Sequence, residues 1–108
     1  MSIIYKYDDV SKTLDLKLSG RLDFASHHKF SEAYQSEPVE SVDQYILDLS
    51  ELTYLDSSAL GMLLLLKDHV LKTSTISITN CSSDVYKIFE IANFNQLFNI
   101  TKLSSSVS

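Results

Sequence analysis

The fold is decided by the stretch Tyr54-Leu55-Asp56-Ser57-Ser58-Ala59-Leu60-Gly61-Met62-Leu63-Leu64-Leu65-Leu66. Asp56, Ser57 and Ser58 stand just before an apolar run. A side-chain oxygen at that point can accept hydrogen bonds from the unpaired amides of a first helical turn. The run consists largely of good helix formers and contains no proline. We therefore predict a helix from about Ser58 to Leu71, with Ser57 or Ser58 as its N-cap.

The start of this helix is also a place where an anion is favoured. Unpaired amides point outward there, and the helix dipole is positive at that end. A phosphate on Ser57 would add about two negative charges at the end of the helix that tolerates them. The simpler interpretation is that the two serines cap the helix and do no chemistry, and the pattern by itself favours that interpretation.

The composition is that of one small domain. The chain has 108 residues, 44% hydrophobic and 21% charged, which suffices for one core. The net charge of −5 argues against a nucleic-acid partner. The single cysteine, Cys81, excludes an internal disulfide and fits a reducing compartment. The first residues lack the basic start and long apolar stretch expected of a signal peptide, and the longest apolar run is too short to span a membrane. We expect a cytoplasmic protein.

Alternating and capped segments predict a mixed sheet with crossover helices. The predicted strands are Ile3–Tyr7, Leu14–Ser19, Tyr45–Leu49 and Thr75–Thr79, with a final turn and short strand between Phe94 and Ile100. Helices are predicted within Arg21–Tyr34 and after the capping segment Asn80–Asp84, where the apolar stripe is Val85, Ile88, Phe89 and Ala92. The first two strands form a hairpin, Tyr45–Leu49 is a central strand covered on both faces, and residues 50–54 are a connection. Crossover helices make the later strands parallel. We expect an α/β fold with four to five strands and helices mainly on one face. Residues 1–103 form one domain, and 104–108 a disordered tail.

The long helix carries more apolar surface than one face requires. One stripe joins Leu60, Leu63, Leu64 and Leu71, and another joins Met62, Leu65, Leu66 and Val70. One stripe must face the sheet, and the other is covered by neighbouring helices or docks a partner. The predicted docking residues, next to Ser57, are Ala59, Leu60, Met62 and Leu63.

Other reactive residues give weaker patterns. His27 and His28 are helix neighbours that point about 100° apart, so they do not readily share a metal, and we predict neither a metal nor a cofactor. A Ser57 hydrolase lacks the G-x-S-x-G elbow, and no enzyme is predicted. Cys81 near a helix start could have a lowered pKa, although a small buried cysteine is the usual case. Asp23 either caps the first helix or lies at the same end of the sheet as Asp56, where α/β sites gather. Asp56 itself is a second candidate for a capping or orienting residue.

The segment Leu55-Asp56-Ser57-Ser58-Ala59-Leu60-Gly61 resembles the D-S-[ST]-[GA]-L-G signature of STAS domains of the anti-sigma factor antagonist type, and the resemblance extends from about Ile3 to Leu103. It implies that a serine kinase phosphorylates Ser57, and we take Ser58 as the second choice for the modified residue. It also implies that Asp23, in a G-x-L-D turn, lines the site together with Asp56 and Ser58. Unphosphorylated, such a protein binds an anti-sigma factor or partner-switching kinase. Phosphorylated, it releases that partner, and a PP2C-type phosphatase reverses the modification.

Within this family, Tyr54–Leu66 and Asn80–Val85 look closest to a proteobacterial branch. Its members are similar to partners of a response regulator that carries both a phosphatase and a kinase domain, and they act on the flagellar anti-sigma factor. Two alternatives stay open. One is a nucleotide-binding sensor STAS domain, although neither Gly20 nor Gly61 belongs to a glycine-rich loop. The other is a constitutive structural interaction module.

Overall fold

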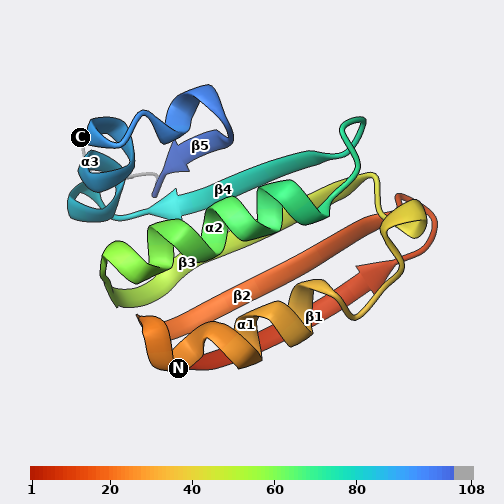
Figure 1. The fold of residues 1–108 in the computed structure, drawn as a ribbon, viewed down its shortest axis with the longest axis horizontal. Helices are drawn as coiled ribbons and strands as arrows, with labels where there is room; N and C mark the ends of the chain where they lie inside the picture. Colours follow the sequence, from red (N-terminus) through yellow and green to blue (C-terminus); the bar gives the residue numbers. More distant parts are fainter. Residues whose placement is uncertain (104–108) are drawn as a thin grey trace.

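Five strands form one sheet in the order β1-β2-β3-β4-β5 in the computed structural model, which describes residues 1–103 (Figure 1). The strands are β1 (Ser2–Asp8), β2 (Thr13–Leu22), β3 (Gln44–Leu55), β4 (Thr75–Cys81) and β5 (Asn99–Lys102). The β1–β2 pair is antiparallel, and the other neighbours are parallel. The predicted mixed α/β sheet is confirmed. The tail predicted at 104–108 lies outside the described residues.

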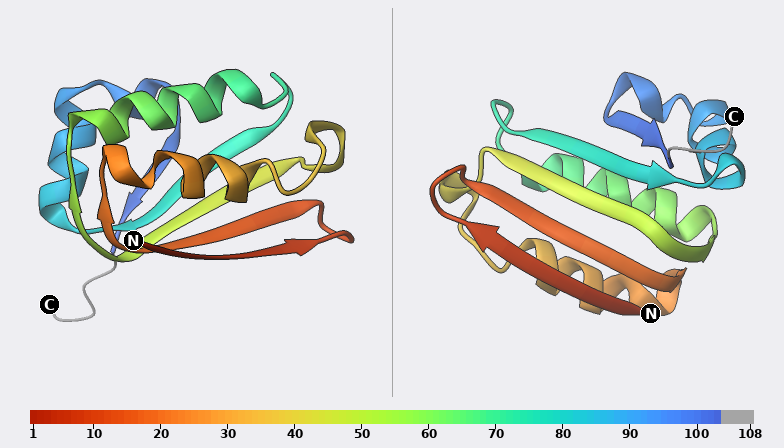
Figure 2. Two further views of the ribbon diagram at one scale, coloured as in Figure 1. Left: turned by 60° about the horizontal axis from the view of Figure 1, so that its bottom comes forward. Right: turned by 180° about the vertical axis from the view of Figure 1, so that it is seen from behind.

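The helices α1 (His27–Tyr34) and α2 (Ser57–His69) lie on one face of this sheet, and the opposite face, here called the bare face, is covered by no helix of residues 1–103 (Figure 2). The third helix, α3 (Ser83–Ile91), contacts β4 and β5. There are also three short 3-10 helices within residues 1–103, η1 (Phe24–Ser26), η2 (Val39–Ser41) and η3 (Phe94–Gln96). The expectation of helices mainly on one face is therefore correct. Of the helices within residues 1–103, none is long and apolar enough to cross a membrane.

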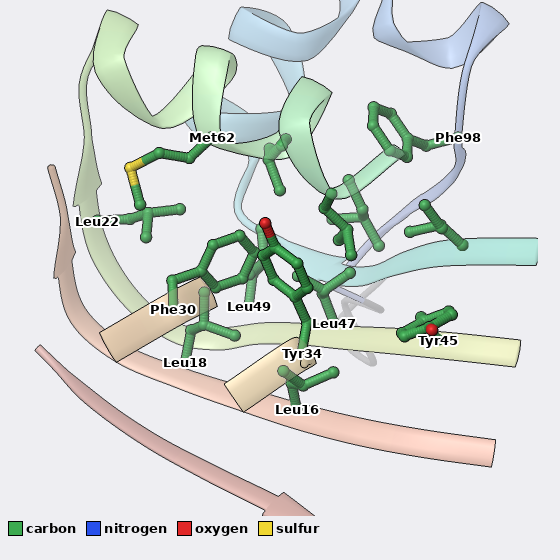
Figure 3. Close-up of a cluster of buried hydrophobic side chains, with 14 of the residues drawn as sticks. Leu16, Leu18, Leu22, Phe30, Tyr34, Tyr45, Leu47, Leu49, Met62 and Phe98 are labelled. Carbon is green, nitrogen blue, oxygen red and sulfur yellow. The ribbon is translucent and has the colours of Figure 1, made fainter. Parts of the chain in front are cut away.

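The core lies between the sheet and the two helices that cover it (Figure 3). Alternate residues of β2 and β3 point into it, as the period of two predicts. From the other side, α1 and α2 contribute one stripe each. The buried residues that meet there include Leu16, Leu18, Leu47, Leu49, Phe30, Tyr34, Met62 and Leu66.

β3 is longer and more exposed than predicted. Residues 50–54, predicted as a connection, continue the strand to Leu55. Their polar side chains lie on the sheet surface, where a strand and a loop have the same composition. The strand is also not covered on both faces, because Ile46 and Asp48 on the bare face are only half-buried. The longer strand carries the chain directly to the start of α2.

Candidate functional site

The carboxyl ends of β2 and β3 lie side by side and carry the two predicted acidic residues. Leu22 is paired with Leu55, and the Asp56 N–H donates to the Leu22 carbonyl at 3.4 Å. Asp23 and Asp56 follow directly after these paired ends, at the edge of the sheet where α/β proteins usually bind ligands. The expectation that both turns open at the same end of the sheet is confirmed.

Asp56 is the N-cap of α2. Its backbone is extended, and its Oδ1 accepts a hydrogen bond from the Ala59 N–H at 3.2 Å. Such a cap is typically worth about 1 kcal/mol. The prediction that Ser57 or Ser58 caps the helix is wrong, because β3 reaches Leu55 and leaves Asp56 in the cap position. The helix therefore begins one residue earlier than predicted, with both serines inside its first turn.

The two serines differ in exposure. The Ser57 side chain is exposed, whereas Ser58 is half-buried. Because Asp56 supplies the cap, the Ser57 hydroxyl is not required to hold the helix start. Ser57 stands among the first amides of α2, which have no partner within the helix, and in the positive end of the dipole. An anion at this position is compatible with the helix.

Asp23 is held mainly by its own turn. It is the N-cap of η1, where Ser26 Oγ lies 3.2 Å from Asp23 Oδ1 and accepts a hydrogen bond from the Asp23 N–H at 3.3 Å. Arg21 Nε lies 3.6 Å from Asp23 Oδ2. The interpretation of Asp23 as a cap of the first helical segment is therefore supported. Its side chain keeps 27% of its surface exposed, so it also faces solvent at the shared end of the sheet.

Three residues that the sequence analysis missed complete this end of the sheet. Arg21 and Tyr54 are paired across β2 and β3, and Arg21 Cζ lies 4.1 Å from the centre of the Tyr54 ring. Phe24, next to Asp23, is 77% exposed. The Arg21–Tyr54 contact depends on a strand register that only the longer β3 reveals. The exposure of Phe24 could have been predicted from the sequence, because Phe24 does not belong to the apolar stripe of the helix that follows it.

The outward side of α2 is not the one predicted. Ala59, Met62 and Leu63 are in the core, so their side chains do not offer a docking surface, and Leu60 is only half-exposed. The helix is apolar nearly all round, so its periodicity does not tell which side faces the sheet. The side that faces solvent, here called the outer face of α2, consists of Ser57, Gly61, Leu64, Leu65 and Asp68.

Two features make this outer face unusual for a solvated helix. Leu64 is 44% exposed and Leu65 is 52% exposed. Gly61 lies between them and Ser57, and a Cβ added there would meet no atom within 4 Å. Packing within the described residues thus does not require glycine at this position. The outer face of α2 therefore carries the Ser57 hydroxyl at one end, no side chain at Gly61, and two exposed leucines beyond it.

A recess next to Asp23 is the nearest hollow that a ligand could enter. It has a volume of about 210 Å³ and is lined by Met1, Arg21, Asp23, Ala25, Ser26 and Lys29. Pockets for small molecules usually measure about 300–1,000 Å³, so this recess is small for a nucleotide. The Lys29 ammonium, a possible phosphate ligand, donates instead to the Met1 carbonyl at 3.1 Å.

The histidines and the cysteine lie apart from this end of the sheet. His27 and His28 are exposed, and the His69 ring packs against Tyr34 with 5.3 Å between ring centres. Cys81 is fully buried, and burial raises the pKa of its thiol to about 11. The suggestion that Cys81 has a lowered pKa is therefore wrong, and the alternative of a small buried cysteine is correct. Residues 1–103 hold no group of three or more His, Cys, Asp or Glu side chains placed to bind a metal.

Comparisons with known proteins agree on one family. The family model described as "Mlab, STAS domain" matches residues 6–102. A STAS-domain containing protein of Pseudomonas aeruginosa (strain UCBPP-PA14) is 48% identical over 89 residues, which cover 82% of this chain and 87% of that protein.

Solved structures with the same fold include anti-sigma factor antagonists. The antagonist SpoIIAA in its unphosphorylated form has a TM-score of 0.73 and 16% identity, covering 95% of this chain and 90% of that one. An antagonist from Mycobacterium paratuberculosis has a TM-score of 0.77 and 17% identity, covering 92% and 85%. The phosphorylated form of the Bacillus SpoIIAA has a TM-score of 0.64 and 19% identity, covering 94% and 92%. At such identities the likeness shows the fold.

Proposed function

This chain belongs to the STAS domain family, and from that premise we propose that it is an anti-sigma factor antagonist controlled by phosphorylation of Ser57. Unphosphorylated, it binds an anti-sigma factor or a partner-switching kinase, and the sigma factor is set free. Phosphorylated, it releases that partner. In this proposal the chain is the substrate of a kinase and a PP2C-type phosphatase, it is not an enzyme itself, and it needs no cofactor.

One observation carries the proposal: the exposed Ser57 side chain shares a helix face with two exposed leucines. Ser57, Leu64 and Leu65 all belong to the outer face of α2. Residues separated by seven or eight positions return to the same side of a helix. A partner that covers the leucines therefore also approaches the hydroxyl. The modified atom would then lie at the border of the contact surface.

Electrostatics supports release by phosphate. A phosphoserine carries about −1.5 to −2 charges at pH 7. At the start of α2 this charge is favoured by the dipole while it is solvated. Covered by a partner without a matching cation, it loses its hydration, and a penalty of about 3 kcal/mol would weaken binding roughly 100-fold. The outcome is loss of the partner with the fold intact.

The docking surface that we propose is revised from the sequence-based one. Ala59, Met62 and Leu63 are replaced by Gly61, Leu64 and Leu65, while Leu60 is kept at the border. The exposed ring of Phe24 and the Arg21–Tyr54 pair, at the end of the sheet where α2 begins, are further candidates for contact with the partner. Aromatic and arginine side chains are the residues most often found at the energetic centre of interfaces.

The more specific assignment concerns the pathway. We place the chain in the proteobacterial branch in which a response regulator with both a kinase and a phosphatase domain sets the state of Ser57. Its target in that assignment is the flagellar anti-sigma factor. Because an anti-sigma factor acts where transcription takes place, the proposal locates the chain in the cytoplasm.

The decisive experiment combines mass spectrometry with a binding measurement. Peptide mass spectrometry of the chain from its native cells, with Ser57→Ala as control, is expected to find one phosphate at Ser57. Calorimetric titration with the flagellar anti-sigma factor is expected to give tight binding for wild type and Ser57→Ala. Ser57→Asp is expected to bind roughly 100-fold more weakly.

Ser58→Asp is the matched control, because it adds the same charge one position along the helix. It is expected to weaken binding less, since Ser58 lies off the outer face. If Ser57 carries no phosphate in any growth phase and Ser57→Asp binds like wild type, the chain is a constitutive interaction module instead. A nucleotide that binds the wild-type chain in the same calorimeter would favour the sensor alternative.

A further inference from the structure

β1 is an edge strand whose outer side pairs with nothing in residues 1–103 (Figure 2). Its seven residues pair with β2 in one unbroken register from Ser2 to Asp8. The strand contains neither proline nor glycine. An edge of this kind presents a row of backbone donors and acceptors to which another strand can add.

The opposite edge of the same sheet is protected. β5 has only four residues and ends in Lys102, and its register with β4 is interrupted. Short length, irregular pairing and lysine are the usual devices that prevent edge-to-edge association. β1 lacks the first two, and its one lysine, Lys6, stands near its C-terminal end. The two edges of this sheet are thus built differently.

β1 also exposes apolar side chains on both of its faces. Ile4 is 68% exposed on the bare face, and Tyr5 is 49% exposed on the side of the helices. Tyr5 alternates with Ile3 and Tyr7, which pack against the core. Its exposure shows that α1 does not cover the outer margin of β1. A strand added to this edge would therefore have room on both faces.

We propose that β1 pairs antiparallel with β1 of a second copy of this chain, about a two-fold axis that passes through Ile4. In this register Ile4 lies opposite Ile4 of the partner, and Ile3 lies opposite Tyr5. Pairs between β-branched and aromatic residues are among the favourable cross-strand pairs. Lys6 lies opposite Ser2, so like charges do not meet. A register centred on Lys6 would place two lysines opposite each other, which is unfavourable.

This contact is compatible with the proposed function but does not depend on it. On the helix-covered face, α2 lies over β3 and β4, away from β1, and α1 lies nearer to β1 (Figure 1). The outer face of α2 therefore stays accessible in the dimer. Each assembly would present two Ser57 side chains, one on each copy.

Sedimentation velocity over a range of concentrations tests the dimer. Wild type is expected to move from monomer to dimer as concentration rises. Ile4→Lys places two lysines opposite each other and is expected to stay monomeric at concentrations at least about tenfold higher. The matched control is Ile91→Lys, because Ile91 is 75% exposed on α3 and is expected to behave like wild type.

A disulfide tests the register itself. Residues directly opposite in an antiparallel pair have Cα atoms about 4.5–5.5 Å apart, within the range of a disulfide. Ile4→Cys is therefore expected to form a covalent dimer on mild oxidation, much faster than Ile91→Cys. The native Cys81 is buried and stays reduced. A wild type that remains monomeric throughout, or equal cross-linking of the two cysteine variants, would overturn the proposal.

Discussion

At the scale of single residues, the Tyr45 hydroxyl is an anomaly in the core. Tyr45 is fully buried, and its hydroxyl has no hydrogen-bond partner within residues 1–103. Burial raises its pKa. A buried hydroxyl without a partner costs about 1–3 kcal/mol. We therefore predict that Tyr45→Phe raises the free energy of unfolding by about 1 kcal/mol, measured by urea denaturation.

Tyr7→Phe is the control for this prediction. The Tyr7 hydroxyl donates to the Ser41 carbonyl, so its removal is expected to lower the free energy of unfolding. The two substitutions delete the same atom with opposite expected signs. Equal destabilisation by both would mean that Tyr45 does have a partner, for example a buried water.

Sequence reasoning located the important residues near the helix start but not their roles. Asp56, Ser57 and Ser58 are all suitable N-caps, and the sequence does not tell which of them holds that position. The answer depends on where β3 ends, and its last stretch mixes the exposed Ser50, Glu51 and Thr53 with the buried Leu52 and Leu55, so it does not read as a continuing strand. In the same way, the contact between Arg21 and Tyr54 follows from a strand register that no local pattern reveals.

At the scale of elements, the sequence predicts that α2 is a helix but not which side of that helix faces the sheet. Its residue types and its start signal predict a helix, but leucines on every side remove the polar face that would set the orientation. The structure turns Ala59, Met62, Leu63 and Leu66 inward. The amphipathic α3 illustrates the opposite case. Its apolar residues are spaced as one stripe, of which Val85 and Phe89 are buried, whereas Ile88 and Ala92 at the margin of the stripe are exposed.

Gly61 gives the prediction at this scale. Glycine inside a helix is about 1 kcal/mol less favourable than alanine, and a methyl group at Gly61 would contact nothing within 4 Å. We predict that Gly61→Ala raises the free energy of unfolding by about 0.5–1 kcal/mol in thermal denaturation. If a partner covers the outer face of α2, the same methyl weakens its binding. The control is Lys87→Ala, because Lys87 is exposed on α3 and lies outside the outer face of α2, and little change is expected in either quantity. A destabilised Gly61→Ala would contradict the open surroundings described for this residue.

At the scale of the whole molecule, the architecture was more predictable than its surfaces. Strand alternation, crossover helices and the D-S-S-A-L-G resemblance together predict a mixed sheet with helices on one face, and the fold has that form. The same signals do not tell which side of α2 faces solvent or that β1 presents an unprotected edge. Those properties depend on how complete elements pack, so they follow from the assembled sheet and not from any one segment.

The last prediction asks whether a negative charge at Ser57 changes the stability of the whole domain or only its binding to a partner. Ser57 occupies the first position of α2, where a negative charge is worth about 0.3–1 kcal/mol of stabilisation. Ser57→Asp is therefore expected to melt at the same temperature as wild type or a few degrees higher, as measured by calorimetry or circular dichroism. Asp56→Ala removes the cap and is expected to lose about 1 kcal/mol, which lowers the melting temperature by roughly 4–8 °C in a domain of this size. If Ser57→Asp melts as low as Asp56→Ala, the charge acts by unfolding the start of the helix. If it melts like wild type yet fails to bind, the charge acts at the interface, as the proposed switch requires.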